Sequence, residues 1–266
     1  MKIWKAAALV SGASIIGWGF SFTYRHFAEQ ADEGMIFDRP RVEMPVVSGE
    51  RPVLAEPALP VPVEPLPPVT PKIWPDVPFI SQAPTGEWGK SEFQNGCEEA
   101  SALMVHAWRE GKAYTKETAR AELVAMARYQ EEKIGQGIDT DVADTARLLL
   151  AGYFDIAEYR LAYDFTLDDL RQATGAGLVI VPANGRALGN PNFTAPGPLE
   201  HMLVVTGYDA EKKEFITNDP GTRKGAGYRY PEQVLFDAIR EYPTGKHVPI
   251  TINRKAMIIV PVVSNS

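Results

Sequence analysis

The stretch NGCEEASALMVHAWR, residues 95–109, decides the architecture of the globular part of the chain. Its apolar residues recur at helical spacing until a glycine ends the pattern, so we expect a helix over 97–109 with one buried face. The first helical residue, Cys97, is the only cysteine among 266 residues. Free N–H groups at a helix N-terminus lower the pKa of a thiol there, whereas the charges of Glu98 and Glu99 raise it. Cys97 is therefore a candidate nucleophile, and a small buried core residue is the alternative.

Periodicity predicts several more helices and strands in the rest of the chain. Further helices are expected at 115–130, 140–150, 166–173 and 231–241, and strands at 178–181, 201–208, 214–217 and 257–260. Because helices precede strands that follow one another in sequence, we expect an α+β domain with N-terminal helices packed on a mainly antiparallel sheet.

The N-terminus predicts a membrane segment. Residues 6–24 carry no charge, and as a helix they rise about 28 Å, close to the roughly 30 Å hydrocarbon core of a bilayer. Lys2 and Lys5 precede this run, which favours a cytoplasmic N-terminus and an extracytoplasmic remainder. No clear small-residue cleavage pattern follows, so we interpret 1–24 as an uncleaved signal-anchor; a cleaved signal peptide, and hence a secreted protein, is the alternative.

A proline-rich segment, residues 25–72, separates this anchor from the globular part. More than half of the chain's 22 prolines lie between Pro40 and Pro78. Such a composition favours extended polyproline II chain and predicts a spacer, rather than a ligand for an aromatic groove. The remaining residues, 73–266, form the predicted folded domain.

Composition excludes several classes of function. The net charge of −7 and the pI of about 5.3 argue against nucleic acid as a partner, because phosphate binding needs clustered Lys and Arg. The sequence contains no CxxC or HExxH spacing and no glycine-rich phosphate loop, so we expect no metal and no cofactor.

A cysteine nucleophile needs a base, and the chain has four histidines. His26 lies beside the membrane segment, His106 lies on the opposite face of the helix that begins at Cys97, and His247 lies in a loop. His201 begins a predicted strand, where a side chain can be presented rigidly at a cleft. His201 is therefore the best candidate base, although a polar residue that merely starts a strand would look the same.

Two further roles remain. The imidazole needs an orienting partner, and Asp219, after the next strand, is the first candidate, with Asn218 as the alternative. The developing oxyanion needs a donor such as a side-chain amide. Gln82 follows an apolar segment expected to lie beside the cysteine helix and is preferred to Gln94.

The order of these motifs resembles a known family. Segments 77–82, 96–101, 201–209 and 218–220 follow one another as in the C39-like branch of the papain-like cysteine peptidases, and the resemblance covers residues 74–261. It implies the papain-like fold, with Gln82 as oxyanion donor, Cys97 as nucleophile, His201 as base and Asp219 as orienter. The chain has Cys-Glu-Glu where many relatives have Cys-Gly-Pro. It also lacks the transporter segments of the bacteriocin-exporting members.

These expectations combine into one functional hypothesis. We expect a cysteine peptidase that cuts a peptide or amide bond outside the cytoplasm. Residues 6–24 would tether it to the cell membrane. Its partner would be a peptide or protein substrate, with cell-wall peptide as one candidate. The alternatives are a non-catalytic peptide-binding or cell-surface module and a cell-wall amidase or acyltransferase.

The long segment 184–200, which leads to His201, is expected to border the substrate cleft. Phe193 would offer apolar contact and Arg186 a charge for a carboxylate. A loop that merely connects two strands is the alternative.

Overall fold

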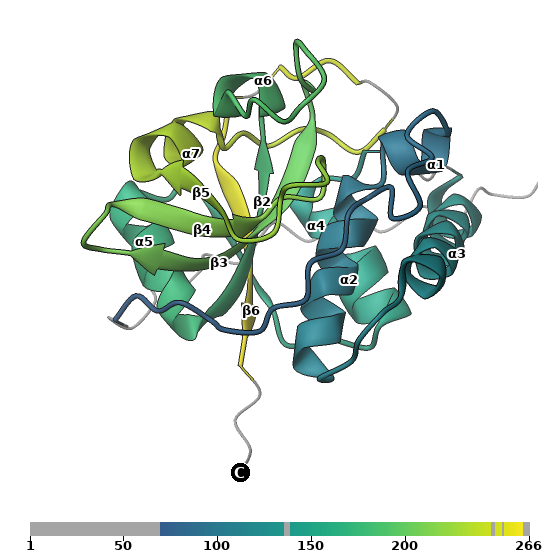
Figure 1. Cartoon of the computed structure of the whole chain (residues 1–266), viewed down its shortest axis with the longest axis horizontal. Coiled ribbons are helices and arrows are strands. Elements are labelled where there is room, and N and C mark those ends of the chain that lie inside the picture. Colours follow the sequence, from purple (N-terminus) through teal and green to yellow (C-terminus); the bar gives the residue numbers. More distant parts are fainter. Residues whose placement is uncertain (1–69, 136–138, 246–247, 252, 263–266) are drawn as a thin grey trace, which may run out of the picture. The chain divides into compact units, whose positions relative to one another are not determined.

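The structure, a computed structural model, describes residues 70–135, 139–245, 248–251 and 253–262 (Figure 1). The predicted membrane helix 6–24 and nearly all of the predicted linker lie outside these residues. Within the described ranges, no helix is both long and apolar enough to cross a membrane.

The described residues contain one six-stranded sheet in which every pair of neighbours is antiparallel (Figure 1). The strands lie in the order β1-β6-β2-β3-β4-β5. Their bounds are β1 Arg160–Tyr163, β2 Gly177–Ala183, β3 His201–Asp209, β4 Glu214–Asn218, β5 Tyr228–Pro231 and β6 Ala256–Pro261. The predicted α+β class with an antiparallel sheet is confirmed.

The helices of the described residues begin with the one that carries Cys97. This helix, α2, spans Cys97–Arg109, as predicted. The others are α1 Ser91–Gln94, α3 Lys116–Ile134, α4 Val142–Asp144, the π-helix η1 Thr145–Tyr153, α5 Leu167–Ala176, α6 Gly185–Leu188 and α7 Glu232–Ala238. The prediction of one α-helix at 140–150 is wrong, because a short α-helical segment there continues as a π-helix.

Helices cover both faces of the sheet (Figure 1). Leu178 and Ile180 of β2 belong to the core that contains residues of α2, α3 and η1. The alternating residues Val179 and Val181 belong to a second core, which contains residues of α5 and α7. A strand buried on both faces needs apolar residues at every position, which explains the uninterrupted Leu-Val-Ile-Val run.

The strand order is the main feature that local pattern did not predict. β6 comes last in the chain but pairs between β1 and β2, so the strands are not arranged sequentially. The edge strands β1 and β5 are four residues long and were not predicted, because so short a segment shows a periodicity too weak to separate from chance.

The chain before α1 runs beside β3 and then past the end of β4. Ile73 forms an isolated bridge with Gly207, at a register shift in β3. Further along, the backbone N–H of Gln82 donates to the carbonyl oxygen of Pro220 at 3.0 Å. This segment therefore brings Gln82 to the loop that follows β4.

Candidate active site

Cys97 lies at the first turn of α2, directly after a close approach between two parts of the backbone. A Cβ atom at Gly96 would come within 2.7 Å of the carbonyl oxygen of Glu92, so a side chain there would force α1 away from α2. The thiol is 5% exposed. The first backbone N–H groups of a helix have no partner within it, so the N–H of Cys97 is available to an oxyanion beside the sulfur.

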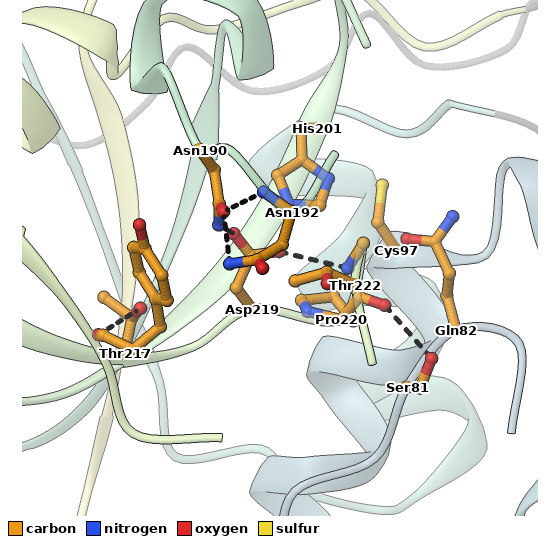
Figure 2. A network of polar contacts seen from close by, with 12 residues as sticks. Ser81, Gln82, Cys97, Asn190, Asn192, His201, Thr217, Asp219, Pro220 and Thr222 are labelled. Atoms are coloured by element: carbon orange, nitrogen blue, oxygen red, sulfur yellow. Dashed lines mark hydrogen bonds and ion pairs between the residues drawn. The ribbon is translucent and has the colours of Figure 1, made fainter. Parts of the chain in front are cut away.

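His201 and Asp219 meet at the ends of two neighbouring strands. His201 is the first residue of β3, and Asp219 directly follows β4, which pairs with β3. The Nε2 atom of His201 lies 2.8 Å from Oδ1 of Asp219, and both side chains are almost completely buried. Because an ionised carboxylate only accepts hydrogen bonds, Nε2 carries the hydrogen. In Figure 2 the other side of the imidazole ring faces Cys97, which leaves Nδ1 for the thiol.

Asp219 is held by several donors besides His201. The hydroxyl of Tyr230 donates to Oδ2 at 2.7 Å, and the backbone N–H of Gly221 donates to Oδ1 at 3.0 Å. Burial by itself raises the pKa of Asp219, but the charge of His201 and these hydrogen bonds leave the pKa below its usual 3.8. Asp219 is therefore ionised at neutral pH and can stabilise a protonated imidazole.

Asn218, the alternative orienter, makes different contacts. Its Nδ2 donates to the carbonyl oxygens of Val77 at 3.1 Å and Pro78 at 3.3 Å, and its Oδ1 accepts from the N–H of Gly227. Asn218 thus fastens the segment that carries Gln82, and the contact to His201 is made by Asp219.

Gln82 is buried in the same site, but its amide is turned away from an oxyanion. Its Nε2 donates to the carbonyl oxygens of Phe93 at 3.0 Å and Gln94 at 2.9 Å, which uses both amide hydrogens. Its Oε1 is buried without a hydrogen-bond partner in the described part of the chain and lies on the Cys97 side of the amide (Figure 2). Donation to an oxyanion would require this amide to rotate.

The thiol of Cys97 donates to its neighbour rather than to the imidazole. Sγ lies 3.0 Å from Oε2 of Glu98, and the described residues include no hydrogen bond between Cys97 and His201. Burial, then the negative charge of Glu98, raises the pKa of Cys97 well above its usual 9.0. The described site therefore holds a protonated thiol.

Of the other histidines, His106 is stacked on Phe154 with ring centroids 4.2 Å apart, and burial lowers its pKa. It is not part of the site. His247 and His26 lie outside the described residues.

The segment 184–200 borders the site, as expected. Phe193 packs edge-on against the ring of His201, with centroids 5.3 Å apart. A cavity of about 510 Å³ is lined by Gln94 and Asn95, just before the nucleophile, by Arg186 and Arg240, and by the acidic residues Asp139 and Glu200. Nε of Arg186 donates to the carbonyl oxygen of Gly197 at 3.2 Å, and Nη2 of Arg240 donates to that of Leu199 at 3.4 Å. Contact between Arg186 and a carboxylate of a substrate stays a prediction.

Two further residues of this site, Asn190 and Tyr230, were not predicted from the sequence. Nδ2 of Asn190 donates to the Tyr230 hydroxyl at 2.8 Å and lies 3.4 Å from Oδ2 of Asp219. Asn190 comes from the loop before β3, and Tyr230 from the edge strand β5. No local signal marks either residue: Tyr230 reaches Asp219 because β5 pairs with β4, and Asn190 reaches it from the loop between α6 and β3.

Buried carboxyl groups predict that the domain is more stable in mild acid. Burial raises the pKa of Glu98 to about 6 and that of Glu241 to about 7, and it raises the pKa of Glu99 well above its usual 4.5. The folded state then binds more protons than the unfolded state, so stability falls as pH rises from about 4.5 through these values, by about 1.4 kcal/mol per pH unit for each group. The lowered pKa of His106 has the opposite effect on stability, but it is one group, whereas the three carboxyl groups of Glu98, Glu99 and Glu241 act together.

Thermal unfolding of the full chain at pH 5 and pH 8 measures this trend, and we expect the higher Tm at pH 5. Glu241→Gln should reduce the difference between the two values. A Tm that is equal or higher at pH 8 would contradict the predicted coupling.

The sequence is similar to a known family. The family model described as "Peptidase_C39 like family" matches residues 75–244, more than half of the chain. No curated protein matches the chain. The matched range contains Gln82, Cys97, His201 and Asp219.

Proposed function

We propose that this chain, which belongs to the Peptidase_C39 like family, is a cysteine peptidase that hydrolyses a peptide or amide bond through Cys97, His201 and Asp219. Membership of a cysteine peptidase family supports the reaction class. The observation that carries the assignment of residues is the buried His201–Asp219 pair at 2.8 Å, with the free ring nitrogen turned to the only cysteine in the chain.

The proposed reaction has two halves. Cys97 transfers its proton from Sγ to Nδ1 of His201, and the thiolate attacks the carbonyl carbon of the substrate. His201 then gives the proton to the leaving amine as the carbon–nitrogen bond breaks, which leaves a thioester on Cys97. A water molecule, deprotonated by His201, hydrolyses the thioester and restores the thiol. Asp219 keeps the imidazole in the required tautomer and stabilises its charged form.

The direct test is hydrolysis by the full chain in detergent. Peptide libraries and cell-wall fragments are incubated with the protein before and after alkylation with iodoacetamide, and products are identified by mass spectrometry. Release of new amino termini that disappears after alkylation of Cys97 is the expected result. If every substrate stays intact while the protein is folded, the protein is a non-catalytic peptide-binding module instead. The hydrogen bond from Cys97 to Glu98 is the observation that favours this alternative.

Gln82 is proposed to stabilise the oxyanion after its amide rotates. Gln82→Ala should lower kcat by about 10²-fold or more with little change in KM, because the amide would act mainly in the transition state. Steady-state kinetics and thermal unfolding are measured together. Gln94→Ala is the matched control, since Gln94 is exposed in the wall of the neighbouring cavity. A normal kcat with a lower Tm would show that Gln82 only anchors α1 through its bonds to Phe93 and Gln94.

The proposed location is the outer side of the cell membrane. It rests on the uncharged run 6–24, on the lysines before it and on the proline-rich segment 25–72. Protease treatment of intact spheroplasts tests it. Digestion of the domain 73–266 only after lysis would place that domain in the cytoplasm and refute the proposal.

A further inference from the structure

Two buried carboxyl groups follow the nucleophile directly, and the reaction described above uses neither. Glu98 and Glu99 are 1% and 2% exposed. Burial of a carboxyl group is costly unless its oxygens are hydrogen-bonded, and Glu98 is bonded at both oxygens. Its Oε2 accepts from Cys97 at 3.0 Å, and its Oε1 accepts from the hydroxyl of Tyr242 at 2.7 Å. The backbone N–H of Thr140 lies 3.4 Å from the same Oε1.

We propose that Glu98 is a proton-dependent latch on the nucleophile: ionised, it holds Cys97 as a thiol, and protonated, it donates its own hydrogen bond to the thiolate. This inference deepens the proposed function and rests on it. Glu98 would thereby be a catalytic residue, since it touches the reacting sulfur atom, and the enzyme would be activated by mild acid.

The geometry supports the latch because the thiol has one proton and two acceptors compete for it. While Glu98 is ionised, the S–H bond is directed to Oε2, and a thiolate at the same position would face a full negative charge 3.0 Å away. Once Glu98 is protonated, that repulsion is gone and the carboxyl O–H can donate to sulfur. The thiol proton can then move to Nδ1 of His201, so protonation of Glu98 favours the reactive ion pair.

The surroundings of Glu98 raise its pKa into the mildly acidic range. The ionisable groups that face it are Cys97 and Glu99 from α2, Asp139 from the chain before α4, and Tyr242 from the chain after α7. Burial and the charge of Asp139 raise its pKa to about 6, against the hydrogen bonds from Tyr242 and Cys97. These acidic groups are not a metal site, since no cluster among the described residues could hold a metal ion.

Alkylation of Cys97 by iodoacetamide tests the latch without any need for turnover. In this reaction the thiolate forms a bond to carbon, and iodide leaves. The rate is measured for the full chain in detergent between about pH 5 and pH 8, with glutathione as a reference thiol. An ordinary thiol slows about tenfold for each pH unit below its pKa. The rate at Cys97 should instead rise by roughly 25-fold from pH 7.5 to 5.5, following the protonated fraction of a group that titrates near pH 6.

Three variants separate the latch from a merely structural role. Glu98→Gln, which keeps an acceptor for Tyr242 and offers a permanent amide donor to sulfur, should be fast at pH 7.5 and lose the rise in acid. Tyr242→Phe removes the hydrogen bond that favours the ionised carboxyl group of Glu98, so the midpoint of the rise in alkylation rate should move to higher pH. Glu99→Gln is the matched control: Glu99 accepts from Gln130 and not from Cys97, so the rise should be retained.

The outcomes also distinguish this inference from the proposed function. A wild-type rate that falls in acid as glutathione does, or identical profiles for Glu98→Gln and wild type, overturns the latch even if hydrolysis is observed. If Glu98→Gln does not fold, an unshifted midpoint in Tyr242→Phe overturns it instead. Alkylation profiles as expected, without hydrolysis of any substrate at any pH, support the latch on the thiol and refute the peptidase.

Discussion

Cys97→Ala is expected to abolish hydrolysis, with kcat/KM reduced by about 10⁴-fold or more, because no other side chain of the site can form the acyl intermediate. The substitution removes one sulfur atom from the start of α2 and leaves the hydrogen bond of Tyr242 to Glu98 in place. The cost to stability is therefore the loss of one hydrogen bond, about 1 kcal/mol. Kinetics on the best substrate and thermal unfolding of the full chain measure both effects.

Cys97→Ser is the matched control for this experiment. Its hydroxyl can still donate to Glu98, as the thiol does, but it is a far weaker nucleophile at neutral pH. Both variants should be inactive, and the serine variant should unfold closer to the wild-type temperature. Hydrolysis near the wild-type rate in either variant would rule out a cysteine mechanism.

His201→Ala is expected to be nearly as damaging to activity, with a loss of about 10⁴-fold, because members of a catalytic triad act as a unit. This variant should also lose more stability than Cys97→Ala. It leaves the completely buried Asp219 without the partner at 2.8 Å that holds its pKa down. Losing a hydrogen bond to a buried charged group costs about 1.5–3 kcal/mol, an upper figure here because Tyr230 and Gly221 still donate to Asp219.

The control for His201 is His106→Ala. His106 is partly buried and stacks on Phe154, away from Asp219. It should lose some stability and keep its kcat. The double variant Cys97→Ala/His201→Ala should be no less active than Cys97→Ala alone. Losses that multiply would show that the two residues act independently, against the proposed mechanism.

The parts of this protein that sequence alone predicted are those set by short-range chemistry. The start of α2 at Cys97 follows from apolar spacing after a glycine, and the start of β3 at His201 follows from an apolar run. Both signals lie within a few residues of the side chain concerned. Asp219 was likewise expected directly after the next predicted strand, and it directly follows β4.

Tertiary structure decided which of these residues meet and in what state. The pairing of β4 with β5 brings Tyr230 to Asp219, and β6 pairs between β1 and β2 although it comes last in the chain. The amide of Gln82 is turned by carbonyl groups at the end of α1, and Glu98 is bonded to Tyr242, 144 residues away. Contacts between residues so far apart depend on long-range pairing and on the shared burial of polar groups, which no local periodicity encodes.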